Sequence, residues 1–175
     1  RSLAIRKKIG SKPGIECTLG NIGIVHSEKG DYDKALDNFD SSLELEEETG
    51  YLYGMGRSLY SIGYYYWYKG DLEKSLDYCN RSLKICEEIS NKSGMLRSLS
   101  VIGCINYSKD HYLKAEEYLD NSITIQKEIG LKERDLLVVT TTHLYLTYKY
   151  LDKEYDIKNL HNLIQEATYI EFDSN

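Results

Sequence analysis

The stretch Leu59-Tyr60-Ser61-Ile62-Gly63 has a related copy on each side of it at the same distance along the chain. Leu19-Gly20-Asn21-Ile22-Gly23 lies 40 residues before it, and Leu99-Ser100-Val101-Ile102-Gly103 lies 40 residues after it. Self-similarity at a fixed interval of this size is typical of proteins built by stacking one small unit several times. The interval therefore decides how the rest of the chain is divided.

Each copy is predicted to contain two helices separated by a tight turn. Apolar residues in the first half of the first copy follow helical spacing rather than strand alternation, which predicts a helix over 15–29. Gly30-Asp31 interrupts the pattern, because glycine is suited to ending one helix and aspartate to capping the next. A second helix is expected over 32–48, with Gly50 ending it.

The interval divides the chain into units over 14–53, 54–93 and 94–133. Residues 1–13 are predicted to be the tail of a truncated upstream unit. Residues 134–175 depart from the pattern and are predicted to form a degenerate terminal unit with a capping helix, since the end of a stacked array needs a face that tolerates water. All units would form one solenoid domain. The two helices of the terminal unit are expected over 135–150 and 155–170.

This pattern resembles the tetratricopeptide repeat, whose signature combines a large residue, a Leu-Gly pair, an aromatic residue and a later alanine. The second unit places Leu59, Ile62-Gly63, Tyr66 and Ser75 at these positions. The other two units match at the apolar-glycine pair and the later alanine, with His26 and Asn106 at the aromatic position. The resemblance covers essentially the whole chain. It implies an all-α fold, a right-handed α-solenoid of stacked antiparallel helix pairs.

The unit departs from the usual repeat in its length, since a tetratricopeptide unit has about 34 residues. The proline common at the end of the second helix is also absent. Both features resemble the longer units of kinesin light chains and of microbial signalling proteins. HEAT and armadillo repeats have units near this length, but they lack the apolar-glycine pair followed by Gly-Asp-Tyr.

Glycine recurs inside the first helix of each unit, as Gly23, Gly63 and Gly103. Each such glycine costs its helix about 1 kcal/mol relative to alanine. The same cost at one position of three units suggests a packing need. We expect the two helices of a unit to approach closely at these glycines.

The resemblance implies that first-helix residues line a concave groove that binds a peptide. The run from Tyr64 to Tyr68 is unusual, because five consecutive aromatic residues on one helix cannot all face the core. The candidate groove residues are Arg57, Tyr60, Tyr64, Trp67, Tyr68, Arg97, Ser100, Cys104, Tyr107 and Tyr148.

Several of these residues also have a purely structural interpretation. Tyr66 is expected in the core, whereas Trp67 is equally suited to groove or packing. Arg57 and Arg97 either form a cationic ladder for a ligand carboxylate or phosphate, or pair with acids such as Glu16 and Glu28. A solvated acidic face is predicted for Glu44, Glu46, Glu47 and Glu48.

Composition excludes several classes of function. A net charge of −6 argues against non-specific nucleic-acid binding. No apolar run approaches the roughly 20 residues of a membrane span. No metal, cofactor or catalytic motif appears, so no enzyme is expected. Reduced, packed thiols typical of a cytoplasmic protein are expected at Cys17, Cys79, Cys86 and Cys104.

The leading hypothesis is an interaction scaffold within a larger protein, which binds a peptide or helix of another protein in its groove. The alternative is a structural or sensory segment that gates an effector domain or self-associates through the solenoid ends into a homo-oligomer. Both rest on the resemblance in fold rather than on a recognised chemical site.

Overall fold

The computed structural model describes residues 12–130 and 134–153, and its regular elements over those residues are all α-helices. The chain divides into two compact units, Arg1–Gly94 and Met95–Asn175. The all-α prediction is confirmed. Of the predicted segments, most of the upstream tail over 1–13 and the second terminal helix over 155–170 lie outside the described residues.

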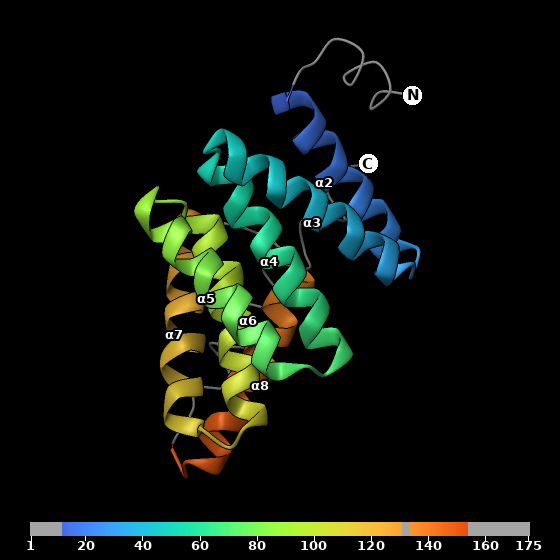
Figure 1. Cartoon of the computed structure of the whole chain (residues 1–175). Coiled ribbons are helices and arrows are strands. Elements are labelled where there is room, and N and C mark those ends of the chain that lie inside the picture. The colour runs from blue at the N-terminus through green and yellow to red at the C-terminus, as the bar shows by residue number, and fades with distance from the viewer. Residues whose placement is uncertain (1–11, 131–133, 154–175) are drawn as a thin grey trace, which may run out of the picture. The chain divides into compact units, whose positions relative to one another are not determined.

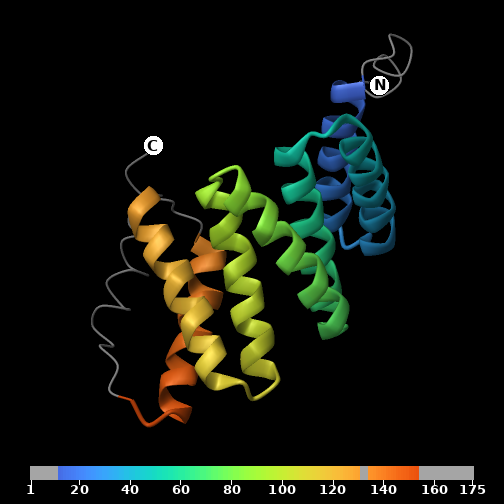
Figure 2. The same ribbon diagram turned by 60° about the vertical axis from the view of Figure 1, so that its left-hand side comes forward.

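The described part of unit 1 contains four complete helices, which Figures 1 and 2 show from two sides. Two or three residues join each helix to the next, and such short connections make neighbouring helices antiparallel. Each helix contacts the one that follows it. The four helices are α2 (Lys12–Glu28), α3 (Tyr32–Thr49), α4 (Leu52–Lys69) and α5 (Leu72–Glu88).

The turns between these helices use the residues that the sequence indicated. Gly50 follows α3 with a φ of +69°, in the left-handed region that favours glycine. Ser90, at the equivalent position of the next 40-residue repeat, adopts a φ of +54° despite its side chain. Asp71 caps α5, because its carboxylate accepts a hydrogen bond from Lys74 N at 3.2 Å. Asp31 does not cap α3 in this way.

The core of unit 1 lies among α3, α4 and α5. Its buried members are Ala35, Phe39, Leu43, Leu59 and Ile62. Side chains at the edge of this cluster pack against it while keeping some exposure, as expected for a thin stacked array that cannot enclose every apolar group. The half-buried side chains around it are Leu36, Met55, Tyr66, Tyr78 and Ile85.

Unit 2 contains most of α6 (Lys92–Ser108), together with α7 (Tyr112–Ile129) and α8 (Arg134–Tyr150). The predicted helix over 135–150 is therefore confirmed. The hydroxyl of Ser100 in α6 lies 2.7 Å from the Ser122 hydroxyl of α7 and 2.9 Å from the Thr140 hydroxyl of α8. This buried polar contact joins all three helices.

In each of the three 40-residue repeats, a serine of the second helix hydrogen-bonds to a backbone carbonyl of the first helix at the equivalent position. Ser82 Oγ donates to the Gly56 carbonyl oxygen at 2.7 Å. Ser42 Oγ lies 2.8 Å from the Glu16 carbonyl oxygen, and Ser122 Oγ lies 3.2 Å from that of Leu96. The bonded residues are 26 positions apart in every case, so the 40-residue interval repeats in atomic contacts as well as in sequence.

Candidate functional site

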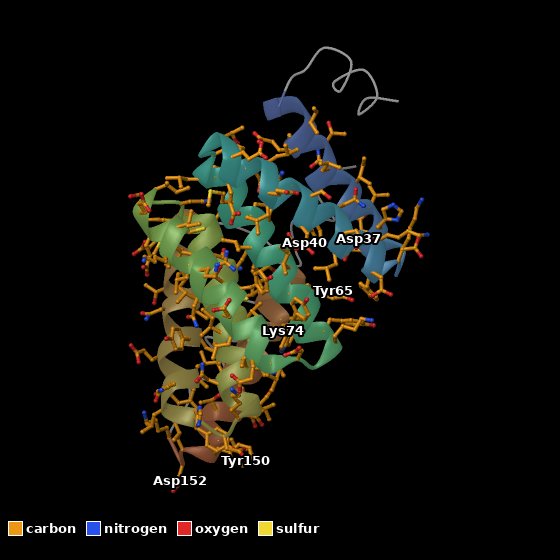
Figure 3. All side chains as sticks on the ribbon, viewed as in Figure 1. Asp37, Asp40, Tyr65, Lys74, Tyr150 and Asp152 are labelled. Carbon is orange, nitrogen blue, oxygen red and sulfur yellow. The ribbon has the colours of Figure 1, made fainter. Side chains whose placement is uncertain are left out.

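The aromatic run of α4 separates into an inner and an outer set. Tyr65, labelled in Figure 3, is buried, and its hydroxyl donates to Asp33 Oδ1 of α3 at 2.7 Å. Tyr66 stacks on Tyr78 of α5 with ring centroids 5.7 Å apart and the planes inclined by 15°. Tyr66 packs half-buried against the core cluster. These two rings hold α4 against its neighbours and are not available to a ligand as flat surfaces.

Three other rings form an outer row on α4, which we call the aromatic strip: Tyr60, Tyr64 and Trp67. Their spacing of four and three residues places them on one face of the helix. The ring centroids are 6.0 Å apart for Tyr60 and Tyr64 and 5.5 Å apart for Tyr64 and Trp67. Tyr64 is 41% exposed, and the other two are half-buried. The strip is a continuous aromatic surface with one open ring at its centre.

Tyr68 is exposed but belongs to a different contact. Its ring centroid lies 4.5 Å from that of Tyr32, the first residue of α3. Tyr32 lies in the recurring turn segment and was not among the predicted groove residues. Tyr68 therefore flanks the aromatic strip at the end of α4 and packs against α3.

Arg57 extends across α2 from the other end of α4. Its Nη2 atom lies 2.7 Å from where a Cβ on Gly20 would be, so the guanidinium occupies the space that this glycine leaves. Within the described residues, Arg57 has no ion pair, with Glu16, Glu28 or any other acid. Burial raises the pKa of Glu46, and the charge of Arg57 offsets part of that rise. Arg57 is half-exposed beside the strip.

Two of the residues that were predicted to line a groove lie in the interior of unit 2 instead. Ser100 is buried and forms the hydroxyl contact with Ser122 and Thr140. Cys104 is also buried, and burial raises the pKa of its thiol to about 12. Neither side chain presents a surface to a ligand in the described structure. Small side chains at these positions allow close packing that a phenol ring would prevent.

The remaining candidates in unit 2 take part in local contacts. Tyr107 is half-buried, with its ring centroid 5.5 Å from that of His143 and 5.7 Å from that of Tyr112. Tyr148 donates its hydroxyl to Asp120 Oδ2 at 2.8 Å. Arg97 is half-exposed. Because Arg57 and Arg97 belong to different units, a ladder formed by the two stays a prediction.

The predicted acidic face is wrong for one of its members. Glu46 is 0% exposed, whereas Glu44, Glu47 and Glu48 are exposed as expected. Comparison of the units indicates that the position of Glu46 is buried, since the equivalent positions of the later units hold the uncharged residues Cys86 and Gln126. Both are buried as well. This repeat position is buried in all three of the units where the structure describes it.

The chemistry of the described residues offers no metal centre, because no three His, Cys, Asp or Glu side chains there are placed to share an ion. None of the described helices has the length and apolar character needed to cross a membrane. Three of the four cysteines are buried, while Cys17 is exposed.

Comparison with sequence families gives two matches. Models of the tetratricopeptide repeat match residues 18–49 and residues 54–128. Together these stretches span more than half of the chain. No curated protein matches the sequence significantly.

Solved structures with the same fold are similar at low sequence identity. BtubC from P. vanneervenii matches with a TM-score of 0.69 and 15% identity over 93% of this chain. A signal transduction ATPase of Pyrococcus horikoshii that has a tetratricopeptide repeat sensor matches with a TM-score of 0.73 and 16% identity over 98% of this chain. A kinesin light chain-like protein of Podosopora anserina with nearly identical repeats matches with a TM-score of 0.64 and 14% identity over 98% of this chain.

The chain spans only part of these proteins. It covers 65% of BtubC, 26% of the ATPase and 84% of the kinesin light chain-like protein. At these identities the similarity establishes the fold.

Proposed function

This chain belongs to the tetratricopeptide repeat family through residues 18–49 and 54–128, and we propose from that premise that it is an interaction scaffold within a larger protein. Repeats of this family are general protein-interaction modules and are typically not catalytic. The ligand is a peptide or helix of another protein. It binds the aromatic strip of α4, with Arg57 beside it.

The exposure of Tyr64 between Tyr60 and Trp67 is the observation that supports this proposal. Tyr65 bonds to α3 and Tyr66 stacks on α5, whereas Tyr64 keeps 41% of its surface exposed. Tyrosine and tryptophan combine a large apolar area with a polar group, and they dominate the energetics of many interfaces. Arg57 adds a planar cation suited to a ligand carboxylate.

The test is a peptide selection on the intact chain followed by calorimetry. Peptides selected from a random library are titrated into the wild type, Tyr64→Ala and Tyr145→Ala. Tyr145 is a matched control, because it is an exposed tyrosine (38%) on α8, outside the strip. We expect Tyr64→Ala to weaken binding by about tenfold or more, as for a central interface residue. Equal affinities of the two variants would refute the assignment to the strip.

The similarity to the ATPase with a repeat sensor supports a second candidate, a sensory segment that gates an effector domain or self-associates. Light scattering over a range of protein concentrations separates the two. A dimer that forms with rising concentration, and persists when Tyr64 is replaced by alanine, favours self-association through another surface. A monomer at all concentrations favours the scaffold.

A further inference from the structure

Two buried carboxylates meet where α3 packs against α2 and α4. Glu46 of α3 is 0% exposed and Glu16 of α2 is 1% exposed. Acidic side chains are rarely buried to this extent unless a cation or several donors accompany them. The contact between the first repeat and the start of the second therefore contains an electrostatic feature that the binding surface does not explain.

The hydrogen bonds around Glu46 leave one of its oxygens without a donor. Oε1 lies 2.9 Å from Ser42 Oγ, while Oε2 is buried with no hydrogen-bond partner. The hydroxyl of Ser58 on α4 is also buried and makes no hydrogen bond of full geometry, although it is near enough to Glu46 to lower the pKa of that carboxyl in part. Glu16 Oε2 lies 3.1 Å from Thr49 Oγ1, and that hydroxyl hydrogen is shared with the Leu45 and Glu46 carbonyl oxygens at 2.9 Å and 3.2 Å.

The single hydroxyl hydrogen of Ser42 has two possible acceptors. Ser42 Oγ lies 2.8 Å from the Glu16 carbonyl oxygen and 2.9 Å from Glu46 Oε1. A hydroxyl donates only one hydrogen, so an ionised Glu46 and the carbonyl compete for it. If Glu46 carries a proton, it becomes a donor itself. It can then donate to Ser42 or to Ser58, and the Ser42 proton remains for the carbonyl.

The charges facing Glu46 do not neutralise it. Glu16 on α2 repels its negative charge, and Arg57 on α4 attracts it without forming an ion pair. The backbone of α4 also leaves little room for a compensating group, since a Cβ on Gly54 would lie 2.7 Å from Glu46 Oε1. Burial raises the pKa of Glu46 more than Ser58, Ser42 and Arg57 together lower it.

We propose that Glu46 makes the contact between the first and second repeats sensitive to protons. As pH falls, Glu46 takes up a proton and the contact of α3 with α2 and α4 strengthens. The sign follows from linkage, because a group that binds protons more tightly when folded stabilises the fold at low pH. That stabilisation is lost as pH rises through the folded-state pKa.

The test compares Glu46→Gln with Glu44→Gln on the full chain. Glutamine should be accommodated, since Gln126 occupies the same position of a later unit. Glu44 is an exposed acid on the same helix and serves as the matched control. The urea midpoint of unfolding is measured at pH 7.5 and 5.5 for the wild type and both variants.

We expect Glu46→Gln to have a higher midpoint than the wild type at pH 7.5, with the difference shrinking at pH 5.5. Glu44→Gln should keep the pH dependence of the wild type. The carboxyl titration of Glu46, followed by carbon NMR in the wild type, should have its midpoint above the ordinary value of about 4.3. A Glu46 midpoint at or below that value, or the same pH dependence in both variants, would overturn the proposal.

Discussion

Cys79 of α5 faces Gly63 of α4 so closely that a Cβ on this glycine would lie 2.6 Å from the Cys79 sulfur and 3.2 Å from the Cys79 backbone nitrogen. The same relationship joins Gly23 to Phe39 and Gly103 to Leu119, again with 2.6 Å to the nearest atom. The expected close approach of the two helices in each unit is therefore confirmed. The glycine allows the contact by having no side chain.

Gly63→Ala is expected to destabilise the protein by about 1–3 kcal/mol through overpacking. Alanine favours the helix itself by about 1 kcal/mol, but the atoms it would meet include backbone, which cannot move aside cheaply. The measurement is the free energy of unfolding in urea. Ser61→Ala is the control on the same helix, since the Ser61 hydroxyl bonds only back to the Arg57 carbonyl. A Gly63→Ala protein as stable as this control would contradict the packing argument.

Ser82→Ala is expected to lower the free energy of unfolding by about 0.5–1.5 kcal/mol, the usual net value of one buried hydrogen bond. The lost bond runs to the Gly56 carbonyl and is one of the three that recur between paired helices. Ser41→Ala on α3 is the control, because that hydroxyl is exposed and bonds within its own helix. Equal effects of the two substitutions would show that the recurring bond does not contribute to stability.

Tyr65→Phe is expected to raise the pKa of Asp33 toward its ordinary value. The Tyr65 hydroxyl is the main cause that lowers the pKa of this carboxyl, ahead of the charge of Lys69. Because the pKa is lowered in the folded state, the associated stability is present at neutral pH and is lost as pH falls through the folded-state pKa. Carbon NMR titration of Asp33 checks the shift, with Tyr64→Phe as the control. An unchanged Asp33 titration in Tyr65→Phe would exclude the hydroxyl as its cause.

Alkylation of the native protein near pH 7.5 is expected to modify Cys17 first. Burial raises the pKa of Cys79 and of Cys104 to about 12, so the reactive thiolate is scarce as well as shielded. Cys17 is exposed. Mass spectrometry of peptides after brief iodoacetamide treatment measures the order, and unfolding in urea should make all four sites react. Equal labelling of Cys17 and Cys104 in the native state would contradict the buried placement.

The helices and the glycine contacts could be predicted because they depend on spacing, which one sequence displays. The burial of Ser100 could not be predicted in this way, because it depends on which side chains of the neighbouring helices lie opposite it. Tyr60, Ser100 and Thr140 occupy one repeat position. Two small hydroxyl residues there come within 2.9 Å of each other, whereas the ring of Tyr60 takes part in the aromatic strip.

The burial of the charged residue Glu46 could not be predicted from its sequence neighbours either. Its sequence neighbours are exposed acids, so local composition predicted a solvated face. The repeat position decides instead, because the equivalent residues Cys86 and Gln126 are buried as well. Comparison with Cys86 and Gln126 would have indicated a buried site, but not the hydrogen bonds made there.

Trp67 is the one tryptophan of the chain, and its emission, excited selectively over that of the tyrosines, therefore reports on the aromatic strip. A selected peptide titrated into the intact wild-type protein should change the Trp67 emission with the same dissociation constant that calorimetry gives, because the ligand covers the strip. A peptide that binds by calorimetry and leaves the Trp67 emission unchanged throughout the titration would contradict the account.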